Sequence, residues 1–433
     1  MALLLAACNG NGKATAKSNE KTAEVVTKST TAAAFEYRAL CTPSNNKPAD
    51  FSITETNNAD YDWGLWGHNI WKVVGKDAPK DVYATVNGKR DTTQFCFASE
   101  KLYHILETWI IDQHGTEQTM RFTIMPADNK KACTCKECTK LGNTASNATP
   151  AVEQMVRRLA KRFPKHIFFM TAYHTTMTPP TKSLPANAGV MISTMDIPMR
   201  YTFQESAGYK KFDATLKKWA QVTSRIYVWE YDRNFDDYLT PYPCLEILRQ
   251  RFMYYEKAGI KGIFVNGSGY DYSSFDDVQS YVLSFMMRDP KGTDVEKRVR
   301  EFYAKYFPVC GEYIADYYLL LEDRVKKSNH VIPYYGNINE AQEAYLNREE
   351  FINFWTTLDK KSKAVKGAER QRIGQMLTAF AYTMLQLNPT QTMAEEYIEI
   401  LKDYKSVPGL QNYKETNGPL DKFIKKCIAR YEG

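Results

Sequence analysis

Three acidic residues, Asp128, Asp196 and Glu230, lie at or beside the ends of apolar, β-rich runs of the sequence. Glycoside hydrolysis generally needs two carboxyl groups that flank the scissile bond, about 5 to 5.5 Å apart for retention and about 6.5 to 9.5 Å apart for inversion. One carboxyl must keep its proton near neutral pH, and an apolar wall such as Trp229 favours that form. Each acid alone could equally be a surface or capping carboxylate, but their joint placement favours two-carboxylate chemistry.

Polar and aromatic side chains are frequent at the same strand ends. This mixture suits a sugar, because ring faces stack on C–H surfaces while amides, carboxylates and imidazoles bind hydroxyl groups. The candidate substrate-binding residues are Arg38, Trp66, His68, Asn69, Asn129, Tyr173, His174, Trp229, Asp232 and Asn266. The histidines could instead be packed, hydrogen-bonded side chains, and Trp66 could belong to the core.

Cys133, Cys135 and Cys138 form a C-x-C-x-x-C cluster. This spacing could supply three ligands of a structural zinc site with a fourth ligand from elsewhere, or one local disulfide plus a remote one. We expect disulfides that staple a loop rather than zinc.

No cofactor is expected to be required. The sequence has no phosphate-binding glycine loop, no His-Glu-x-x-His helix and no Gly-x-Ser-x-Gly elbow. Nucleotide chemistry, zinc proteolysis and serine hydrolysis therefore lack support.

Eight apolar, β-rich runs bounded by turn residues must position these side chains. They are residues 35–41, 63–69, 94–98, 121–125, 166–173, 190–194, 225–231 and 262–266. Segments of helical periodicity separate several of them. Such alternation over about 250 residues is typical of a (β/α)₈ TIM barrel, whose active site lies at the carboxyl ends of the strands. We therefore predict an α/β fold with a glycoside-hydrolase-like barrel at residues 32–292.

The remaining residues, 293–433, have a different pattern. They contain long amphipathic runs and no convincing strand. We predict that they form a C-terminal all-helical domain.

The N-terminal segment Leu5-Ala6-Ala7-Cys8 resembles the lipobox of bacterial lipoproteins, in which the cysteine is lipidated. A basic region before it is missing, so either the start is assigned too far downstream or the match is accidental. Residues 1–31 are interpreted as a signal remnant and flexible tether. We expect an exported cell-envelope lipoprotein, held at the outer membrane through lipid on Cys8.

The charges are mixed along the chain. The 57 basic and 50 acidic residues give a net charge of +7 without a block of like charges. This pattern favours a solvated surface over a nucleic-acid partner.

Several segments together resemble a known family: DWGLWGHNIW, NGKRDTTQFCF, CTCKEC, FFMTAYHTTMTPP and RIYVWEYDRNFDDYLTPYP. The family is an uncharacterised one of secreted bacterial proteins, a domain of unknown function similar to glycoside-hydrolase barrels of the alpha-glucuronidase and beta-hexosaminidase kind. By analogy with alpha-glucuronidases, the resemblance implies that Asp128 donates a proton and that Asp196 with Glu230 activates water. The chain departs from both patterns, since those enzymes use Glu at the first position and hexosaminidases follow their Asp with Glu, where this chain has Asn129.

Two functions remain open from the sequence. The first is a glycoside hydrolase acting on a neutral or acidic glycan by a two-carboxylate mechanism. The second is a glycan-binding lipoprotein with a degenerate, non-catalytic barrel. They differ in whether two carboxyl groups face each other across one pocket.

Overall fold

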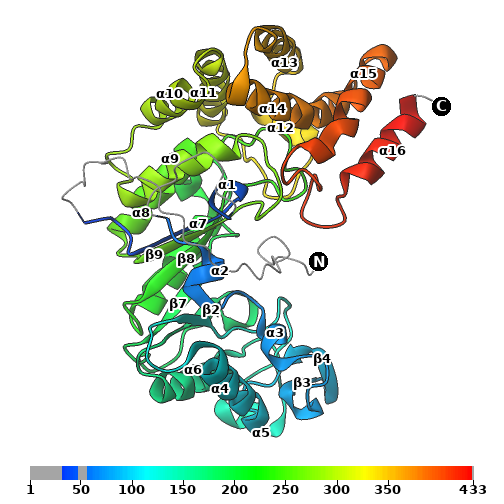
Figure 1. Ribbon diagram of the computed structural model, residues 1–433. Coiled ribbons are helices and arrows are strands. Elements are labelled where there is room, and N and C mark those ends of the chain that lie inside the picture. The colour runs from blue at the N-terminus through cyan, green and yellow to red at the C-terminus, as the bar shows by residue number, and fades with distance from the viewer. Residues whose placement is uncertain (1–31, 47–55, 432–433) are drawn as a thin grey trace.

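A parallel seven-stranded sheet forms the centre of the molecule (Figure 1), as described by a computed structural model for residues 32–46 and 56–431. The strand order is β1-β9-β8-β7-β6-β5-β2. The strands are β1 (Tyr37–Cys41), β2 (Trp63–Leu65), β5 (Arg121–Thr123), β6 (Ile167–Ala172), β7 (Ala188–Ser193), β8 (Ile226–Tyr231) and β9 (Gly262–Asn266). Each lies within one of the predicted runs or overlaps it, so seven of the eight predicted strands are present in this sheet.

Helices connect the successive strands. The longer ones are α4 (Glu100–His114), α6 (Thr149–Arg162), α7 (Ala207–Ala220), α8 (Leu245–Lys257) and α9 (Asp276–Arg288); the shorter ones are α1 (Pro43–Asn46), α2 (Ala59–Asp62), α3 (Ile70–Val74) and α5 (Lys136–Leu141). Every residue of β8 and β9 is buried. Parallel strands covered on both faces are near-continuously apolar, which explains why the sequence marks them so clearly.

The two edge strands of the sheet approach each other. The indole Nε1 of Trp63 on β2 donates a hydrogen bond of 2.7 Å to Tyr37 Oη on β1. Tyr37 also stacks on Tyr227 of β8, with ring centroids 5.4 Å apart, and Phe169 of β6 lies 4.5 Å from the same Tyr227 ring. The sheet therefore curls around an aromatic interior.

The strand predicted at residues 94–98 is not part of this sheet. Residues 89–95 form β4 (Lys89–Phe95), which pairs antiparallel with β3 (Tyr83–Val86). Asn87 and Gly88 both have positive φ, as a tight hairpin turn requires. Most of β4 is not buried, whereas a barrel strand must be covered on both faces. A closed barrel of eight strands is thus absent from the described residues, and the sheet is an open, curled one.

All described elements after β9 are helical, as predicted. Beyond α9 they are α10 (Val295–Tyr306), α11 (Gly311–Ser328), α12 (Ile338–Ala344), α13 (Arg348–Ser362), α14 (Gly367–Gln386), α15 (Gln391–Lys402) and α16 (Leu420–Tyr431). In Figure 1 they gather at one end of the molecule, away from the β3–β4 hairpin at the other end.

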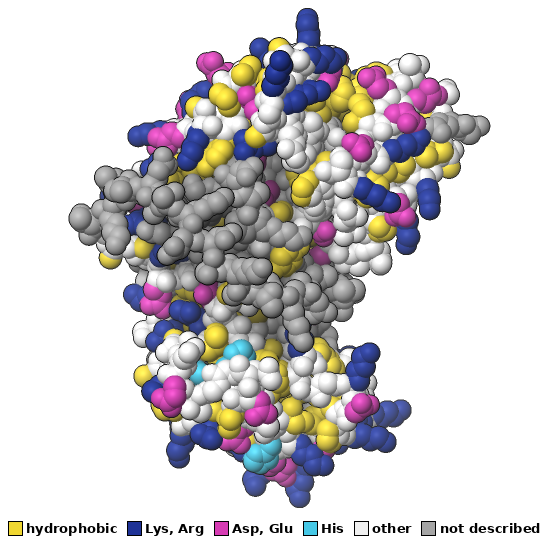
Figure 2. Space-filling view, in the orientation of Figure 1, with side chains coloured by type: hydrophobic (Ala, Val, Ile, Leu, Met, Phe, Trp, Pro, Cys, Tyr) yellow, Lys and Arg dark blue, Asp and Glu magenta, His cyan; other side chains and the backbone are white. Residues whose placement is uncertain are grey.

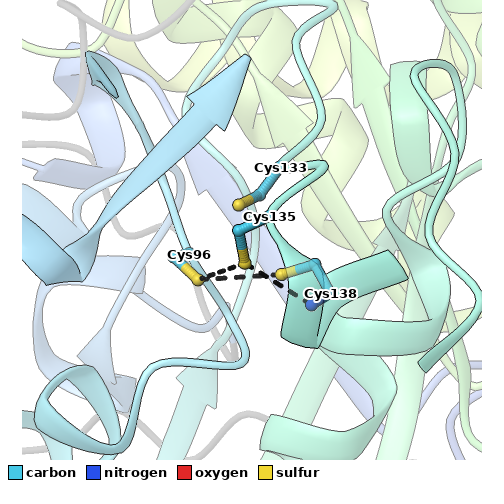
Figure 3. Close-up of side chains that lie close together, drawn as sticks. All are labelled: Cys96, Cys133, Cys135 and Cys138. Atoms are coloured by element: carbon cyan, nitrogen blue, oxygen red, sulfur yellow. Dashed lines mark hydrogen bonds between the residues drawn. The ribbon is translucent and has the colours of Figure 1, made fainter. Parts of the chain in front are cut away.

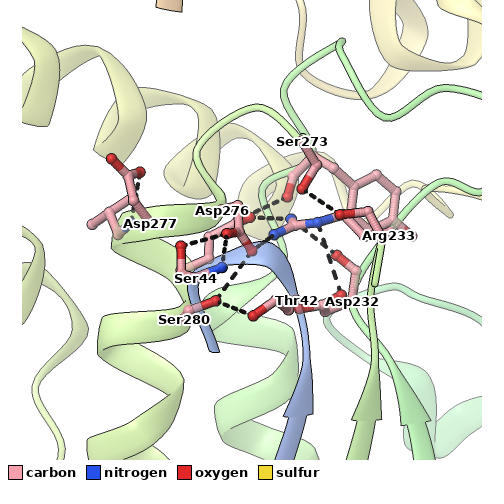
Figure 4. A network of polar contacts seen from close by, with 12 residues as sticks. Thr42, Ser44, Asp232, Arg233, Ser273, Asp276, Asp277 and Ser280 are labelled. Atoms are coloured by element: carbon pink, nitrogen blue, oxygen red, sulfur yellow. Dashed lines mark hydrogen bonds and ion pairs between the residues drawn. The ribbon is translucent and has the colours of Figure 1, made fainter. Parts of the chain in front are cut away.

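A buried polar network joins the strand ends to helix α9 (Figure 4). Arg233, which follows β8, lies 3.3 Å from the Asp276 carboxylate, and the Ser44 amide donates to the other oxygen of Asp276 at 3.0 Å. Thr42 Oγ1 lies 2.8 Å from Ser280 Oγ. Buried charges need such partners, so the network fixes the strand ends against the helix.

Glu322 on α11 fastens the helical region to the sheet region. Its two carboxylate oxygens accept the backbone N–H groups of Leu245 and Glu246 at 2.9 and 3.1 Å, which caps the N-terminus of α8. Tyr318 Oη donates a further hydrogen bond of 2.7 Å. Burial raises the pKa of Glu322 to about 7, against the effect of these hydrogen bonds.

The described surface is mixed in charge. Figure 2 shows Lys and Arg side chains dispersed among Asp and Glu side chains on the face in view. Among the helices of the described ranges, none combines the length and apolarity that a membrane span requires. Cys8 and the tether lie outside the described residues, so lipidation, export and membrane attachment stay predictions.

Candidate active site

A pocket opens at the carboxyl ends of β6, β7 and β8, beside the loop that follows β2. Its lining residues are His68, Thr171, Tyr173, Met191, Ser193, Trp229 and Tyr231. The cavity is small, with a volume of about 20 Å³ for the centres of water-sized groups. The carboxyl ends of parallel strands are where α/β folds of this kind place their ligand sites.

Trp229 forms the floor of the pocket, and the buried Trp66, which is not among the lining residues, stacks on it. The rings of Trp66 and Trp229 have centroids 4.9 Å apart and planes inclined by 16°. Both indole Nε1 atoms are buried and have no hydrogen-bond partner among the described residues. A buried donor without a partner is costly, so the N–H group of Trp229, which lines the pocket, is suited to a polar ligand atom.

Asp128, His174 and Tyr173 form a contiguous polar group beside the floor. His174 Nε2 lies 3.7 Å from Asp128 Oδ1, and the Tyr173 and His174 rings stack with centroids 3.7 Å apart. Burial is the main cause that raises the pKa of Tyr173 well above its usual value, and the charge of Asp128 and a hydrogen bond to it add to the effect. Burial lowers the pKa of His174, although the Asp128 charge opposes this, so a neutral imidazole is favoured.

The backbone of His174 is in the left-handed region, with φ of +46°. This conformation is uncommon for residues other than glycine and costs free energy, and it clusters at functional sites. Because His174 lies next to the end of β6, this backbone conformation turns its imidazole back towards Asp128.

His68 reaches the pocket from the loop that follows β2. Its Nδ1 donates a hydrogen bond of 2.5 Å to the carbonyl oxygen of Pro126, which leaves Nε2 as the acceptor in the neutral ring. Burial lowers the pKa of His68, while the Pro126 hydrogen bond and the Asp128 charge oppose the shift. His68 can therefore accept a hydrogen bond from a ligand hydroxyl.

Glu415 is a half-buried acid of the helical region that interacts electrostatically with Asp128. Neither acid is among the residues that line the pocket. It lies between helices α15 and α16, where its backbone N–H donates to Phe235 O at 2.9 Å and its Oε2 accepts from Tyr335 Oη at 3.3 Å. Burial raises the pKa of Glu415 to about 7, and the Asp128 charge contributes to the rise. Its Oε1 is buried without a hydrogen-bond partner in the described part of the chain. Sequence reasoning missed this residue, because nothing in a polar loop of the helical region marks it.

Glu230 is not at the pocket. It is fully buried on the helix-covered face of β8, where its carboxylate pairs with Arg251 at 2.7 Å. Thr194 Oγ1 and Tyr255 Oη also donate to it, at 2.8 and 2.5 Å. Successive side chains of a strand point to opposite faces, so Trp229 and Tyr231 line the pocket and Glu230 cannot.

Asp196 is exposed and its carboxylate lies 2.6 Å from Lys211 Nζ. The charge of Asp196 acts in the same way as that of Asp128: it raises the pKa of Tyr173 and opposes the lowering of the His174 pKa. It thus lies on the same side of the molecule as Asp128, but in an open, ion-paired position.

The other predicted binding residues have structural partners. Arg38 Nη1 donates to Phe35 O at 2.6 Å, and Asn69 Nδ2 donates to Trp66 O at 2.6 Å. Asn129 Nδ2 donates to Thr93 O at 2.9 Å. Because each side chain is bonded to a backbone carbonyl and none lines the pocket, we assign the three residues to support of the local backbone.

Asp232 and Asn266 are fully or almost fully buried behind the strand ends. Neither Asp232 oxygen has a hydrogen-bond partner among the described residues, and Arg233 Nε lies 3.9 Å away. Burial raises the pKa of Asp232 to about 6, while the Arg233 charge opposes the rise. These two residues lie beneath the site and do not line it.

A parallel, curled sheet with helices on its outer face and a pocket at its strand ends places the protein in the α/β class of barrel-like folds. More particularly, the chain belongs to the family described as Domain of unknown function (DUF4838), whose model matches residues 12–319. Comparison with curated proteins gave no match.

Three solved structures illustrate what this chain is similar to. A mutant of the Thermobaculum terrenum O-GlcNAc hydrolase aligns at 11% identity with a TM-score of 0.37, over 78% of this chain and 76% of that one. A GH138 enzyme targeting pectin rhamnogalacturonan II aligns at 6% identity and a TM-score of 0.34, over 77% of this chain and 57% of that one. CpGH84B aligns at 10% identity and a TM-score of 0.29, over 76% of this chain and 66% of that one.

Proposed function

We propose that the protein is a glycoside hydrolase whose active site is the pocket above Trp229, with Asp128 and Glu415 as its two carboxyl groups. The observation that carries the proposal is the pair itself. Asp128 lies 3.7 Å from His174 and is hydrogen-bonded to Tyr173, which lines the pocket, and the half-buried Glu415, whose pKa burial raises to about 7, interacts electrostatically with Asp128.

The floor offers a contact surface for a sugar ring. The Trp229 ring supplies an apolar surface, and its unpartnered N–H group can donate to a hydroxyl or ring oxygen. Ser193 Oγ and Tyr231 Oη lie 3.1 Å apart in the wall and add two groups that can donate or accept.

The two carboxyl groups have different environments, which suits different roles. Glu415 holds its proton up to about pH 7, so it is the proton donor to the glycosidic oxygen. Asp128 is the base that removes a proton from the attacking water, whose oxygen bonds to the anomeric carbon while the bond from that carbon to the protonated glycosidic oxygen breaks. The neutral His174, 3.7 Å away, orients the Asp128 carboxylate.

The role of Asp128 differs from the one implied by alpha-glucuronidases, in which the acid after the fourth strand donates the proton. The reason is the environment of Glu415, where burial raises the pKa by more than the hydrogen bond from Tyr335 lowers it. Glu230 is left out because its charge is already neutralised by Arg251 on the far face of β8.

The test is cleavage of a panel of neutral and acidic glycans by the purified chain, followed by chromatography of the released sugars. We expect the wild type to release sugar from at least one glycan, and Asp128→Asn and Glu415→Gln to lose that activity. Glu205→Gln is the matched control, because Glu205 is exposed and pairs with Arg200 at 3.5 Å. Cleavage that survives both substitutions overturns the assignment of roles. Saturable binding without any cleavage by the wild type would instead support a glycan-binding protein.

A further inference from the structure

Four cysteines from three segments meet at the base of the β3–β4 hairpin (Figure 3). Cys96 follows β4, Cys133 and Cys135 lie in the loop after β5, and Cys138 is in the first turn of α5. All four Sγ atoms lie within 4.8 Å of one another. Three of these cysteines are buried and Cys135 is partly exposed, so the cluster is closed to bulk solvent on most sides.

The spacing of the sulfur atoms is that of a metal tetrahedron. Cys96 Sγ lies 3.7 Å from Cys135 Sγ and 3.7 Å from Cys138 Sγ. A tetrahedral site with Zn–S bonds of about 2.3 Å has sulfur atoms about 3.8 Å apart. A disulfide requires sulfur atoms about 2.05 Å apart, and all four cysteines are free thiols in the structure.

Backbone N–H groups point at two of the sulfur atoms. The Thr85 N–H donates to Cys133 Sγ at 3.2 Å, and the Cys138 N–H donates to Cys135 Sγ at 3.5 Å. Cys135 is the N-cap of α5, so its sulfur also lies at the positive end of the helix dipole. Hydrogen bonds to sulfur and a helix N-terminus both stabilise the thiolate form, which is the form that binds metal.

We propose that Cys96, Cys133, Cys135 and Cys138 bind one structural Zn²⁺ ion. Four thiolates in tetrahedral arrangement are typical of structural zinc, and they leave no open position for a catalytic water. The sequence shows three of the ligands, and the structure adds Cys96 as the fourth. This geometry favours metal over the disulfides expected from the C-x-C-x-x-C spacing alone.

The zinc would fasten the loop that carries Asp128. Gln94 binds this loop on both sides of Asp128. Its Nε2 donates to Ala127 O at 3.2 Å and to Asn129 Oδ1 at 3.0 Å, and its Oε1 accepts from Ala127 N at 2.9 Å. Gln94 lies two residues before Cys96 in the chain. The ion would therefore hold the β3–β4 hairpin, which carries Gln94, next to the loop that carries Asp128, so that the hydrogen bonds between them can form.

The experiment measures metal content on the full chain, purified without chelators, by inductively coupled plasma mass spectrometry. We expect about one zinc ion per chain, and loss of zinc from Cys96→Ser and from Cys138→Ser. Cys310→Ser and Cys427→Ser are matched controls, since both residues are buried free thiols outside the cluster, and they should keep the ion.

Two further measurements keep the proposal testable if a variant does not fold. The wild type reconstituted with Co²⁺ should show the visible absorption of tetrahedral cobalt with thiolate ligands. Alkylation of the unreduced, denatured wild type should find all four cysteines reactive. Near-zero zinc together with disulfides among these four cysteines would overturn the proposal, and so would bound iron in place of zinc.

Discussion

Glu230 and Arg251 form an ion pair in which both side chains are completely buried, with 2.7 Å between Oε1 and Nη1. The pair joins β8 to α8 directly behind the Trp229 floor of the pocket. Arg251 Nη2 also donates to the carbonyl oxygens of Ile197 and Pro198, at 3.0 and 2.9 Å, so one guanidinium links β8, α8 and the loop after β7.

The first prediction is that Glu230→Gln destabilises the protein strongly. Removing one partner of a buried pair leaves an uncompensated charge, so the free energy of unfolding should fall by about 3 to 5 kcal/mol. Denaturant unfolding followed by tryptophan fluorescence measures the change. The control is Glu296→Gln, whose pair with Arg300 lies on the exposed surface of α10 and should matter by under about 1 kcal/mol. A stability loss no larger than that of the control contradicts a structural role for Glu230.

The second prediction concerns Asp128. Asp128→Asn keeps the shape of the side chain and removes its ability to take a proton, so kcat should fall by about 10² to 10⁴-fold. Sugar affinity can be followed through tryptophan fluorescence. It should stay within a few-fold of the wild type because Trp229, which lines the pocket, is unchanged. An Asp196→Asn variant should keep most activity, since Asp196 is exposed and paired with Lys211. If the Asp196 variant is the inactive one, the roles are assigned to the wrong acid.

The third prediction is a pH dependence. Glu415 must be protonated to act as acid, and its pKa is raised to about 7, so activity should persist up to neutral pH and fall as pH rises through about 7. In Glu415→Gln the residual activity should lack this alkaline limb. The measurement is kcat/KM against pH for both proteins. An unchanged alkaline limb in the variant shows that another group is the acid.

The fourth prediction is that Glu322→Gln weakens the attachment of the helical region. An amide presents only one acceptor oxygen, whereas both Glu322 oxygens accept backbone N–H groups at the start of α8. One buried donor is left without a partner, which costs about 1 to 3 kcal/mol. Thermal unfolding should show the loss. Glu312→Gln, at the exposed start of α11, is the control and should leave the melting temperature nearly unchanged.

The sequence predicts the strands well and their faces poorly, and β8 shows why. Its residues are all buried, so the apolar run carries no alternation that would tell Trp229 from Glu230. The sequence therefore shows that an acid lies in the strand. It does not show whether that acid faces the pocket or the helices, because neighbouring residues of a strand face opposite sides. Arg251, the partner that identifies its face, is on another element.

The remaining differences have equally physical causes. The run at residues 94–98 is apolar enough for a sheet strand, but the preceding turn at Asn87 and Gly88 directs the chain into a local hairpin. Local pairing closes a short loop and so forms at lower entropic cost than a distant one. Glu415 lies in a loop whose position depends on the packing of the whole helical region, which no local pattern encodes.

Tyr335 and Glu415 both follow residue 319, where the match to the family model stops. The proposed site would therefore be a composite: the segment matched by the family model contains Trp229 and Asp128, and the rest of this chain contains Glu415. Relatives that differ after that boundary would then keep the strand-end pocket but have a different proton donor. Differences in the pH dependence of activity between family members should therefore follow differences in the C-terminal helices and their loops.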